Sequence, residues 1–332
     1  MKIKMKDVAK RAGVSVATVS YVINGTRNVR EETRKKVEQA IADLNYSPDV
    51  SAQKLKSGQS RLIGLITPKC SGSSTSILIE TCEKRLAQDG YQMLIINTAF
   101  KPEVERNALH ILSSGIVDGI ILVSLCGSSY ELQKELPPNF PCVLANCAYP
   151  DCPVDSIGFT TYRAMQDVVD YIEGKGLEQI SLFSGPAYLS SSQEHEESLK
   201  HALAARGLTF DPEYLVYTKR TEQRTQAETR RLMEKGCRAF LFADFTMMQD
   251  TFQDLETGSF SIPPGCEVIT FCESLSDRKS FKWIPKIQCP TVELGRLACE
   301  RLLTRIKGDR GPVQRTLLDS VFEEAANPEG NN

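Results

Sequence analysis

Two hydrophobic patterns divide the chain. Over residues 1–46, apolar residues such as Val8, Ala9 and Ala12 recur at helical spacing, which is typical of short amphipathic helices. From Arg61 onward, continuous apolar runs alternate with amphipathic helical stretches, the pattern of buried parallel strands with crossover helices. The runs are RLIGLITP, YQMLIIN, VDGIILVS, PCVLA, QISLFSG, RAFLFAD and CEVITFCE. We therefore expect a small all-α head followed by an α/β body of two Rossmann-like subdomains.

The first two predicted helices are joined by a tight turn. Gly13 suits the left-handed backbone that ends a helix, and Ser15 is a good N-cap for the next one. Val14 can pack against Val19 as a hydrophobic staple. Two short helices joined by a glycine-containing turn predict a helix-turn-helix. A third helix within residues 30–46 would close a small core.

The second helix carries small and hydrogen-bonding side chains on the side away from that core. With Val19, Val22 and Ile23 facing inward, the residues that face outward or sideways are Val16, Ala17, Thr18, Ser20, Tyr21 and Asn24. A helix that enters the roughly 12 Å wide major groove needs small residues for close approach and polar groups for phosphates and base edges. Tyr21 and Arg27 are the candidates for longer side chains that contact bases.

Charge is distributed unevenly between the two parts. Residues 1–61 hold 13 Lys and Arg against 6 Asp and Glu, whereas the remainder holds 27 against 36. A basic head on an acidic body suggests a module that binds a polyanion, because phosphate neutralisation supplies most non-specific affinity for nucleic acid. A solvated charged face is the alternative that charge alone leaves open.

Several classes of protein are disfavoured by the sequence. It contains no apolar stretch long enough for a membrane span and no signal peptide, so we expect a cytoplasmic protein that does not contact membrane. The evenly spaced Cys142, Cys147 and Cys152 have no histidine nearby and are expected to be strand and loop residues rather than a metal site. Glycine-rich nucleotide motifs, H-E-x-x-H and G-x-S-x-G are missing, so we expect neither an enzyme nor a cofactor.

The head resembles a known family. The stretch MKDVAKRAGVSVATVSYVINGTRNVREETRKKVEQAIADLNYSP is similar, nearly position by position, to the N-terminal domain of the lactose-repressor (LacI/GalR) family of bacterial transcription regulators. The resemblance implies base contacts for Val16, Ala17, Ser20, Tyr21 and Arg27. It implies phosphate contacts for Ser15, Thr18 and Asn24. Arg30 departs from the Ser or Thr that usually caps the third helix. A helical protein-interaction module is the alternative for the head.

Residues 47–60, SPDVSAQKLKSGQS, are expected to form a hinge. A helix of about eight residues is marginal alone in water. The resemblance implies that two copies fold together over the minor groove of the operator. Leu55 would then be wedged into a central base step, as apolar side chains that kink DNA are, and Ala52 would lie at the close-packed position. Asp49 and Gln53 depart from the usual Asn and Arg.

The body, residues 61–325, resembles the effector domain of the same family, which has the periplasmic-binding-protein fold. The first subdomain is expected over residues 62–157 plus 289–314 and the second over 158–286 plus 316–325. The chain would then cross between them near residues 158, 287 and 316.

The expected effector cleft departs strongly from the sugar-binding pattern of the family. Aligned with its usual contact positions are Thr160, His195, Asp244, Phe245 and Glu273. A plain hexose should bind poorly to such a site, because each polar group left unpaired on burial costs about 1 to 3 kcal/mol. The cleft therefore either accepts another small molecule or has lost sensing, with control passing to a protein partner. His195 could also be a surface residue at a charged helix start.

We accordingly expect a homodimeric transcription regulator that acts as a repressor. Two heads would bind half-sites of a pseudo-palindromic double-stranded DNA operator, and a small-molecule effector would modulate the affinity. A solute-binding protein would share the body fold but has no use for a basic head. The polar tail FEEAANPEGNN has no heptads, so we expect no C-terminal coiled coil.

Overall fold

The computed structural model describes residues 3–24, 27–46, 58–125, 132, 134–147, 152–218, 222–253, 260–272, 281 and 283–325. The chain divides into two compact units, Met1–Ser60 and Arg61–Asn332. Below, the first unit is called the head unit and the second the body.

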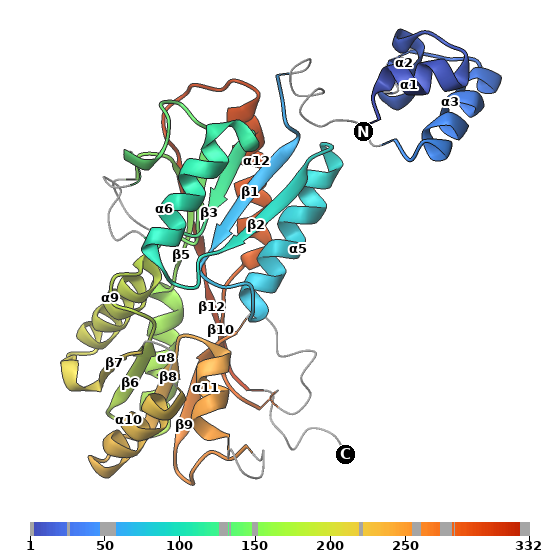
Figure 1. The fold of residues 1–332 in the computed structure, drawn as a ribbon. Coiled ribbons are helices and arrows are strands. Elements are labelled where there is room, and N and C mark those ends of the chain that lie inside the picture. The colour runs from blue at the N-terminus through green and yellow to red at the C-terminus, as the bar shows by residue number, and fades with distance from the viewer. Residues whose placement is uncertain are drawn as a thin grey trace. The chain divides into compact units, whose positions relative to one another are not determined.

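The head unit contains three helices, drawn in blue in Figure 1: α1 (Met5–Ala12), α2 (Val16–Asn24) and α3 (Glu31–Asp43). Gly13 adopts φ +68°, and its N–H donates to the carbonyl of Ala9. The hydroxyl of Ser15 accepts the N–H of Thr18 at 3.1 Å, which is an N-cap bond. Val14 and Val19 pack in one core with residues of α1 and α3. The predicted three-helix head with its helix-turn-helix is confirmed.

The first sheet of the body is parallel and has the strand order β11-β5-β4-β3-β1-β2. Helices α5 (Ser73–Gln88) and α12 (Thr291–Ile306) pack on one face. The helix α6 (Pro102–Ile111) and the π-helical turn η1 (Leu112–Ile116) pack on the other. The strands are β1 (Leu62–Thr67), β2 (Gln92–Asn97), β3 (Gly119–Leu122), β4 (Cys142–Ala145), β5 (Asp155–Thr160) and β11 (Arg315–Asp319).

The second sheet has the order β12-β10-β9-β8-β6-β7, and β12 is antiparallel to its neighbour. Helices α8 (Tyr162–Gly174) and α9 (Ser190–Ala205) cover one face, and α10 (Glu222–Glu234) and α11 (Phe245–Phe252) cover the other. The strands are β6 (Ile180–Ser184), β7 (Leu215–Tyr217), preceded by the short turn η2 (Pro212–Tyr214), β8 (Ala239–Phe242), β9 (Glu267–Phe271), β10 (Lys286–Gln288) and β12 (Val321–Glu323). The predicted α/β body with two parallel-sheet subdomains is confirmed.

The chain passes between the two sheets after β5, after β10 and after β11 (Figure 1). The second passage lies near the expected residue 287, whereas the first and third lie a few residues later than the expected positions near 158 and 316. The reason is that β11 pairs with β5 over its whole length, as far as Asp319 opposite Thr160. Residues 158–160 and 315–319 therefore belong to the first sheet, which corrects the expected boundaries.

One strand departs from its expected burial. The run YQMLIIN was expected to be a buried parallel strand, yet β2 lies at the edge of the first sheet and is largely exposed. Leu94 and Ile95 expose 37% and 43% of their surface. The single chain thus leaves an apolar edge strand uncovered.

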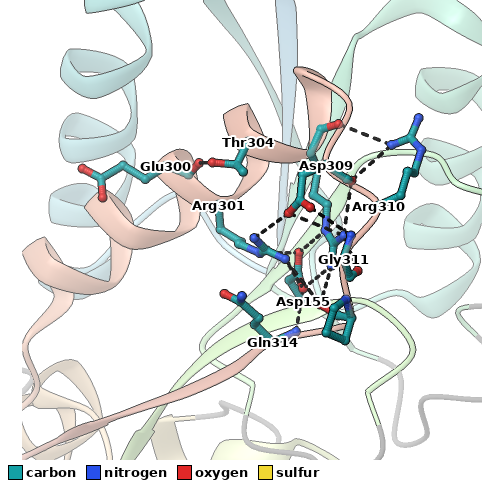
Figure 2. A network of polar contacts seen from close by, with 10 residues as sticks. Asp155, Glu300, Arg301, Thr304, Asp309, Arg310, Gly311 and Gln314 are labelled. Atoms are coloured by element: carbon teal, nitrogen blue, oxygen red, sulfur yellow. Dashed lines mark hydrogen bonds and ion pairs between the residues drawn. The ribbon is translucent and has the colours of Figure 1, made fainter.

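A buried carboxylate ties α12 to the first sheet (Figure 2). Asp155, at the start of β5, exposes 1% of its side chain and accepts hydrogen bonds from Nε of Arg301 and Nε of Arg305, both at 2.7 Å. It also accepts the N–H of Gln314 at 2.7 Å. Burial opposes ionisation, but the bonds from Arg305, Gln314 and Arg301 outweigh it and lower the pKa of Asp155.

Candidate DNA-binding helix and effector cleft

The surface of α2 presents small and polar side chains, as expected. Ser15, Val16 and Ala17 are exposed, and Thr18 and Tyr21 are half-buried. Ser20 is a correction to the expected outward face, because only 9% of it is exposed. Small side chains therefore dominate the accessible start of the helix, and the side chain of Asn24 lies outside the described residues.

Tyr21 and Arg27 lie together. The guanidinium carbon of Arg27 is 5.1 Å from the centre of the Tyr21 ring, within the range of a cation–π contact. Arg27 is exposed. The two longer side chains that the sequence singled out thus form one pair beside the small residues of α2. The hinge residues Ala52 and Leu55 lie outside the described part of the chain, so their roles stay predictions.

Between the two sheets of the body lies a cavity of about 290 Å³. It is formed where the carboxyl ends of the strands meet, the position at which open α/β sheets usually bind ligands. Residues that follow β1, β3 and β4 line one side, and residues that end or follow β6, β8 and β9 line the other. The lining residues include Lys69, Ser184, His195, Asp244, Asp250 and Phe271.

An ion pair crosses this cavity. Nζ of Lys69, which follows β1, lies 2.6 Å from Oδ2 of Asp244, which follows β8. The other carboxylate oxygen, Oδ1, accepts the N–H of Thr246 at 2.9 Å and that of Met247 at 3.4 Å, which caps α11. Asp244 therefore lies in the cleft as predicted, whereas Lys69 was missed because a single lysine in a loop has no recognisable pattern.

His195 also lines the cavity rather than the outer surface. Its ring stacks on Phe271 with centres 4.2 Å apart. Its Nδ1 is buried and has no hydrogen-bond partner among the described residues. Burial lowers the pKa of His195, and the charge of Glu194 opposes this shift only in part. The histidine is thus held neutral with one ring nitrogen available to a ligand.

Two other predicted effector residues, Phe245 and Thr160, are not among the residues that line the cavity. Phe245 is 7% exposed and packs edge-on against Phe281 in the core below the second sheet. Thr160 lies at the passage between the sheets, where its carbonyl accepts the N–H of Ser320 at 2.9 Å. Glu273 lies outside the described residues. Of the expected set, His195 and Asp244 are therefore the described residues that line the cavity, and the role of Glu273 stays a prediction.

Glu194 is a further residue that the sequence did not single out. Its two carboxylate oxygens accept the N–H and the hydroxyl of Thr161, both at 2.7 Å. Thr161 is fully buried and follows β5 at the first passage. Glu194 thus joins α9, which carries His195, to the connection between the two sheets.

Other chemistry is limited in the described part of the chain. The sulfur atoms of Cys147 and Cys152 lie 3.8 Å apart, and Cys142 is buried in β4. Within the ranges given above, no group of three or more His, Cys, Asp or Glu side chains is arranged to hold a metal ion. No helix in those ranges is long and apolar enough to cross a membrane.

Comparison with known families decides the class of protein. The family described as bacterial regulatory proteins, lacI family, matches residues 4–49. The family described as periplasmic binding proteins and sugar binding domain of LacI family matches residues 60–237, more than half of the chain. A periplasmic binding protein-like domain matches residues 169–322. The chain belongs to the LacI family.

Similar proteins agree with this assignment. The HTH-type transcriptional regulator KdgR of Bacillus subtilis is 28% identical over 95% of this chain and 95% of its own length. The ribose operon repressor of Escherichia coli K12 is 29% identical over 96% of this chain and 98% of its own. The lac repressor dimer bound to operator and the anti-inducer ONPF shares the fold, with a TM-score of 0.80 and 22% identity over 98% of both chains. The LacI-family chain is a transcription regulator and not an enzyme, as its sequence predicted.

Proposed function

We propose that this LacI-family regulator is a cytoplasmic repressor that binds a pseudo-palindromic operator as a homodimer, with an affinity that a small molecule in the body cleft modulates. The observation that carries the proposal is the surface of α2. Exposed Val16 and Ala17 allow close approach to base pairs, and the paired Tyr21 and Arg27 supply polar contacts.

The exposed edge strand supports the homodimer. Leu94 and Ile95 of β2 leave apolar surface on an unpaired sheet edge, a feature that marks association surfaces. A second copy of the chain would cover both edges across a two-fold axis. The lac repressor with which the chain shares its fold is likewise a dimer on operator.

The cleft supports control by a ligand. Phe159 and Cys289, beside two of the three connections between the sheets, line a cavity to which both subdomains contribute, so a ligand there would change the angle between the subdomains. Such a change would move the start of the body, to which the hinge with Ala52 and Leu55 is attached. Coupling of about 1 to 3 kcal/mol would change operator affinity about 5- to 150-fold.

One observation favours a second candidate. The Lys69–Asp244 ion pair already satisfies two charges in the cavity, as expected if small-molecule sensing has been lost and a protein partner controls the regulator. The DNA-binding function is the same in both cases.

Selection of binding sequences from random duplex DNA by the purified full chain tests the proposal. Repeating the binding at fixed salt with a panel of metabolites then tests the cleft, because affinities at different salt concentrations are not comparable. A pseudo-palindrome whose affinity shifts with one metabolite supports both parts. A palindrome that no metabolite affects supports the protein-partner candidate, and failure to enrich any sequence contradicts the proposed function.

A further inference from the structure

The lining of the body cavity combines one lysine and two aspartates, Asp244 and Asp250, with the N-termini of two helices. Lys69 is the one Lys or Arg side chain among its described lining residues. Two helices of 16 residues begin at the cavity wall, α5 at Ser73 and α9 at Ser190. Neither has a side-chain cap bond at its N-terminus. Uncapped helix N-termini attract anions through their N–H groups and the helix dipole.

The N-terminus of a third helix, α11, is already bonded to a side chain of the protein itself. The N-terminus of α11 is capped by the carboxylate of Asp244, which also binds Lys69 across the cavity. Asp244 therefore has backbone partners of its own at 2.9 and 3.4 Å that remain when Lys69 moves away. Among the described residues, the Lys69 ammonium has Asp244 as its one carboxylate partner. An incoming anion that replaces Asp244 on Lys69 would leave the Asp244 carboxylate hydrogen-bonded to the N–H groups of Thr246 and Met247.

Two further groups indicate an oxygen-rich ligand independently of charge. Ser184, at the end of β6, is fully buried and lines the cavity, yet its hydroxyl has no hydrogen-bond partner among the described residues. Nδ1 of His195 is likewise buried without a hydrogen-bond partner among the described residues, and His195 lines the same side of the cavity. A buried hydroxyl without a partner costs free energy, which a ligand oxygen would recover. Asp250 also lines the cavity.

We propose that the effector is a small hydroxylated acid whose carboxylate or phosphate takes the place of Asp244 on Lys69 between the starts of α5 and α9. This inference rests on the proposed effector site and names its ligand class. It also names the step that would change the arrangement of the body, because the bound anion breaks the ion pair that joins the two subdomains across the cavity. A neutral sugar has no group that would replace Asp244.

Calorimetric titration of the full chain with matched ligands tests the inference. The probes are glucose, gluconate, glucose 6-phosphate and inorganic phosphate, so that the acid group is the variable and carboxylate is distinguished from phosphate. We expect gluconate or glucose 6-phosphate to bind at least tenfold more tightly than glucose. In Lys69→Met this preference should be lost. In the matched control Lys84→Met, an exposed lysine of α5 paired with Glu80, it should persist.

Ser184→Ala separates a binding role from a structural one. Since the hydroxyl has no partner in the described chain, its removal should leave the urea midpoint unchanged while weakening acid binding several-fold. Glucose binding as tightly as the acids, acid binding that survives Lys69→Met, or no binding by any probe overturns the inference. Operator binding by the same preparation is measured in parallel. If it is intact, the proposed DNA-binding function survives such a failure.

Discussion

Asp155 shows how strongly one side chain can hold the body together. Its carboxylate is the shared partner of Arg301 and Arg305, whose side chains expose only 14% and 13% of their surface (Figure 2). In Asp155→Asn both guanidinium groups would stay largely buried and keep only the partly exposed Asp309 carboxylate, 2.9 Å from Arg301 and 3.7 Å from Arg305, as a partner among the described residues, so we expect the free energy of unfolding to fall by about 3 kcal/mol. Urea denaturation measures this.

Arg310→Ala is the matched control for that substitution. The Arg310 guanidinium contacts only carbonyl oxygens of Arg305 and Asp309, both at 3.4 Å, in an exposed position, so its loss should change stability little. The lowered pKa of Asp155 adds a pH signature. Its contribution is complete above the unfolded value of about 3.9 and is lost as pH falls through the folded value. A stability difference between wild type and Asp155→Asn that does not shrink in acid would contradict the assignment.

His195 should make the stability of the protein depend on pH in a higher pH range than Asp155 does. Because burial lowers its pKa in the folded state, the unfolded chain takes up the proton first, near pH 6.5. The stability that this histidine contributes is present above that pH and is lost as pH falls below it. His195→Phe keeps the stacking on Phe271 and cannot titrate. Urea midpoints measured from pH 7 to pH 5 should therefore fall more for wild type than for this variant, and equal slopes would refute the buried neutral histidine.

Single residues of the cleft could be predicted from the sequence, whereas a contact between two distant segments of the chain could not. Asp244 and His195 were predicted because they align with contact positions of the resembled family, and both line the cavity. Lys69 and Asp244 are 175 residues apart, so their pairing could not be read from either segment. Ser20 was placed outward or sideways by the periodicity of a single helix, which does not reveal that only 9% of its surface is exposed in the folded head unit.

At the scale of the element, the turn between α1 and α2 depends on one hydroxyl. Ser15 caps α2 by accepting the N–H of Thr18, and Ser15→Ala should cost about 1 kcal/mol of helix stability. We expect faster amide hydrogen exchange in the first turn of α2 and weaker operator binding. Ser15→Thr keeps the cap and should behave like wild type. Unchanged exchange in Ser15→Ala would show that packing of Val14 and Val19 alone fixes the turn.

The Tyr21–Arg27 contact makes a second prediction for α2. Tyr21→Ala should relax base preference at one position of each half-site and release Arg27 from the ring. In a double-mutant cycle on operator affinity, the two residues should be coupled by about 0.5 to 1 kcal/mol. Arg11, which pairs with Asp43 instead, is the control. A uniform loss of affinity over all sequences would assign Tyr21 to phosphate contact or to the core.

Most of the buried strands were predicted from apolar runs, but β5 is mostly buried and lies in none of these runs, and β2 lies in one and is largely exposed. The observed β1, β3, β4, β6, β8 and β9 all lie within the apolar runs and are mostly buried. In contrast, β10 and β12 have three residues each, and β11 is mostly exposed. Such strands are defined by their pairing with distant segments rather than by local composition, which is why two of the passages between the sheets were placed a few residues too early.

At the scale of the whole molecule, β2 has the composition of a buried strand and the environment of an exposed one. The conflict disappears if a second chain covers the edge, as in the proposed homodimer. We predict that Leu94→Asp, which would place like charges close together across the two-fold axis, converts dimer to monomer in analytical ultracentrifugation. Operator affinity should fall by about a hundredfold or more, because the second half-site is no longer bound by a linked copy.

Val313→Asp is the control for the opposite side of the same sheet. Val313 is 48% exposed and precedes β11, which forms the far edge from β2. An acidic residue there should leave both the sedimentation coefficient and the operator affinity unchanged. If Leu94→Asp stays dimeric while Val313→Asp dissociates, the association surface lies at the β11 edge. In that arrangement the apolar side chains of β2 would have to be explained by a different partner.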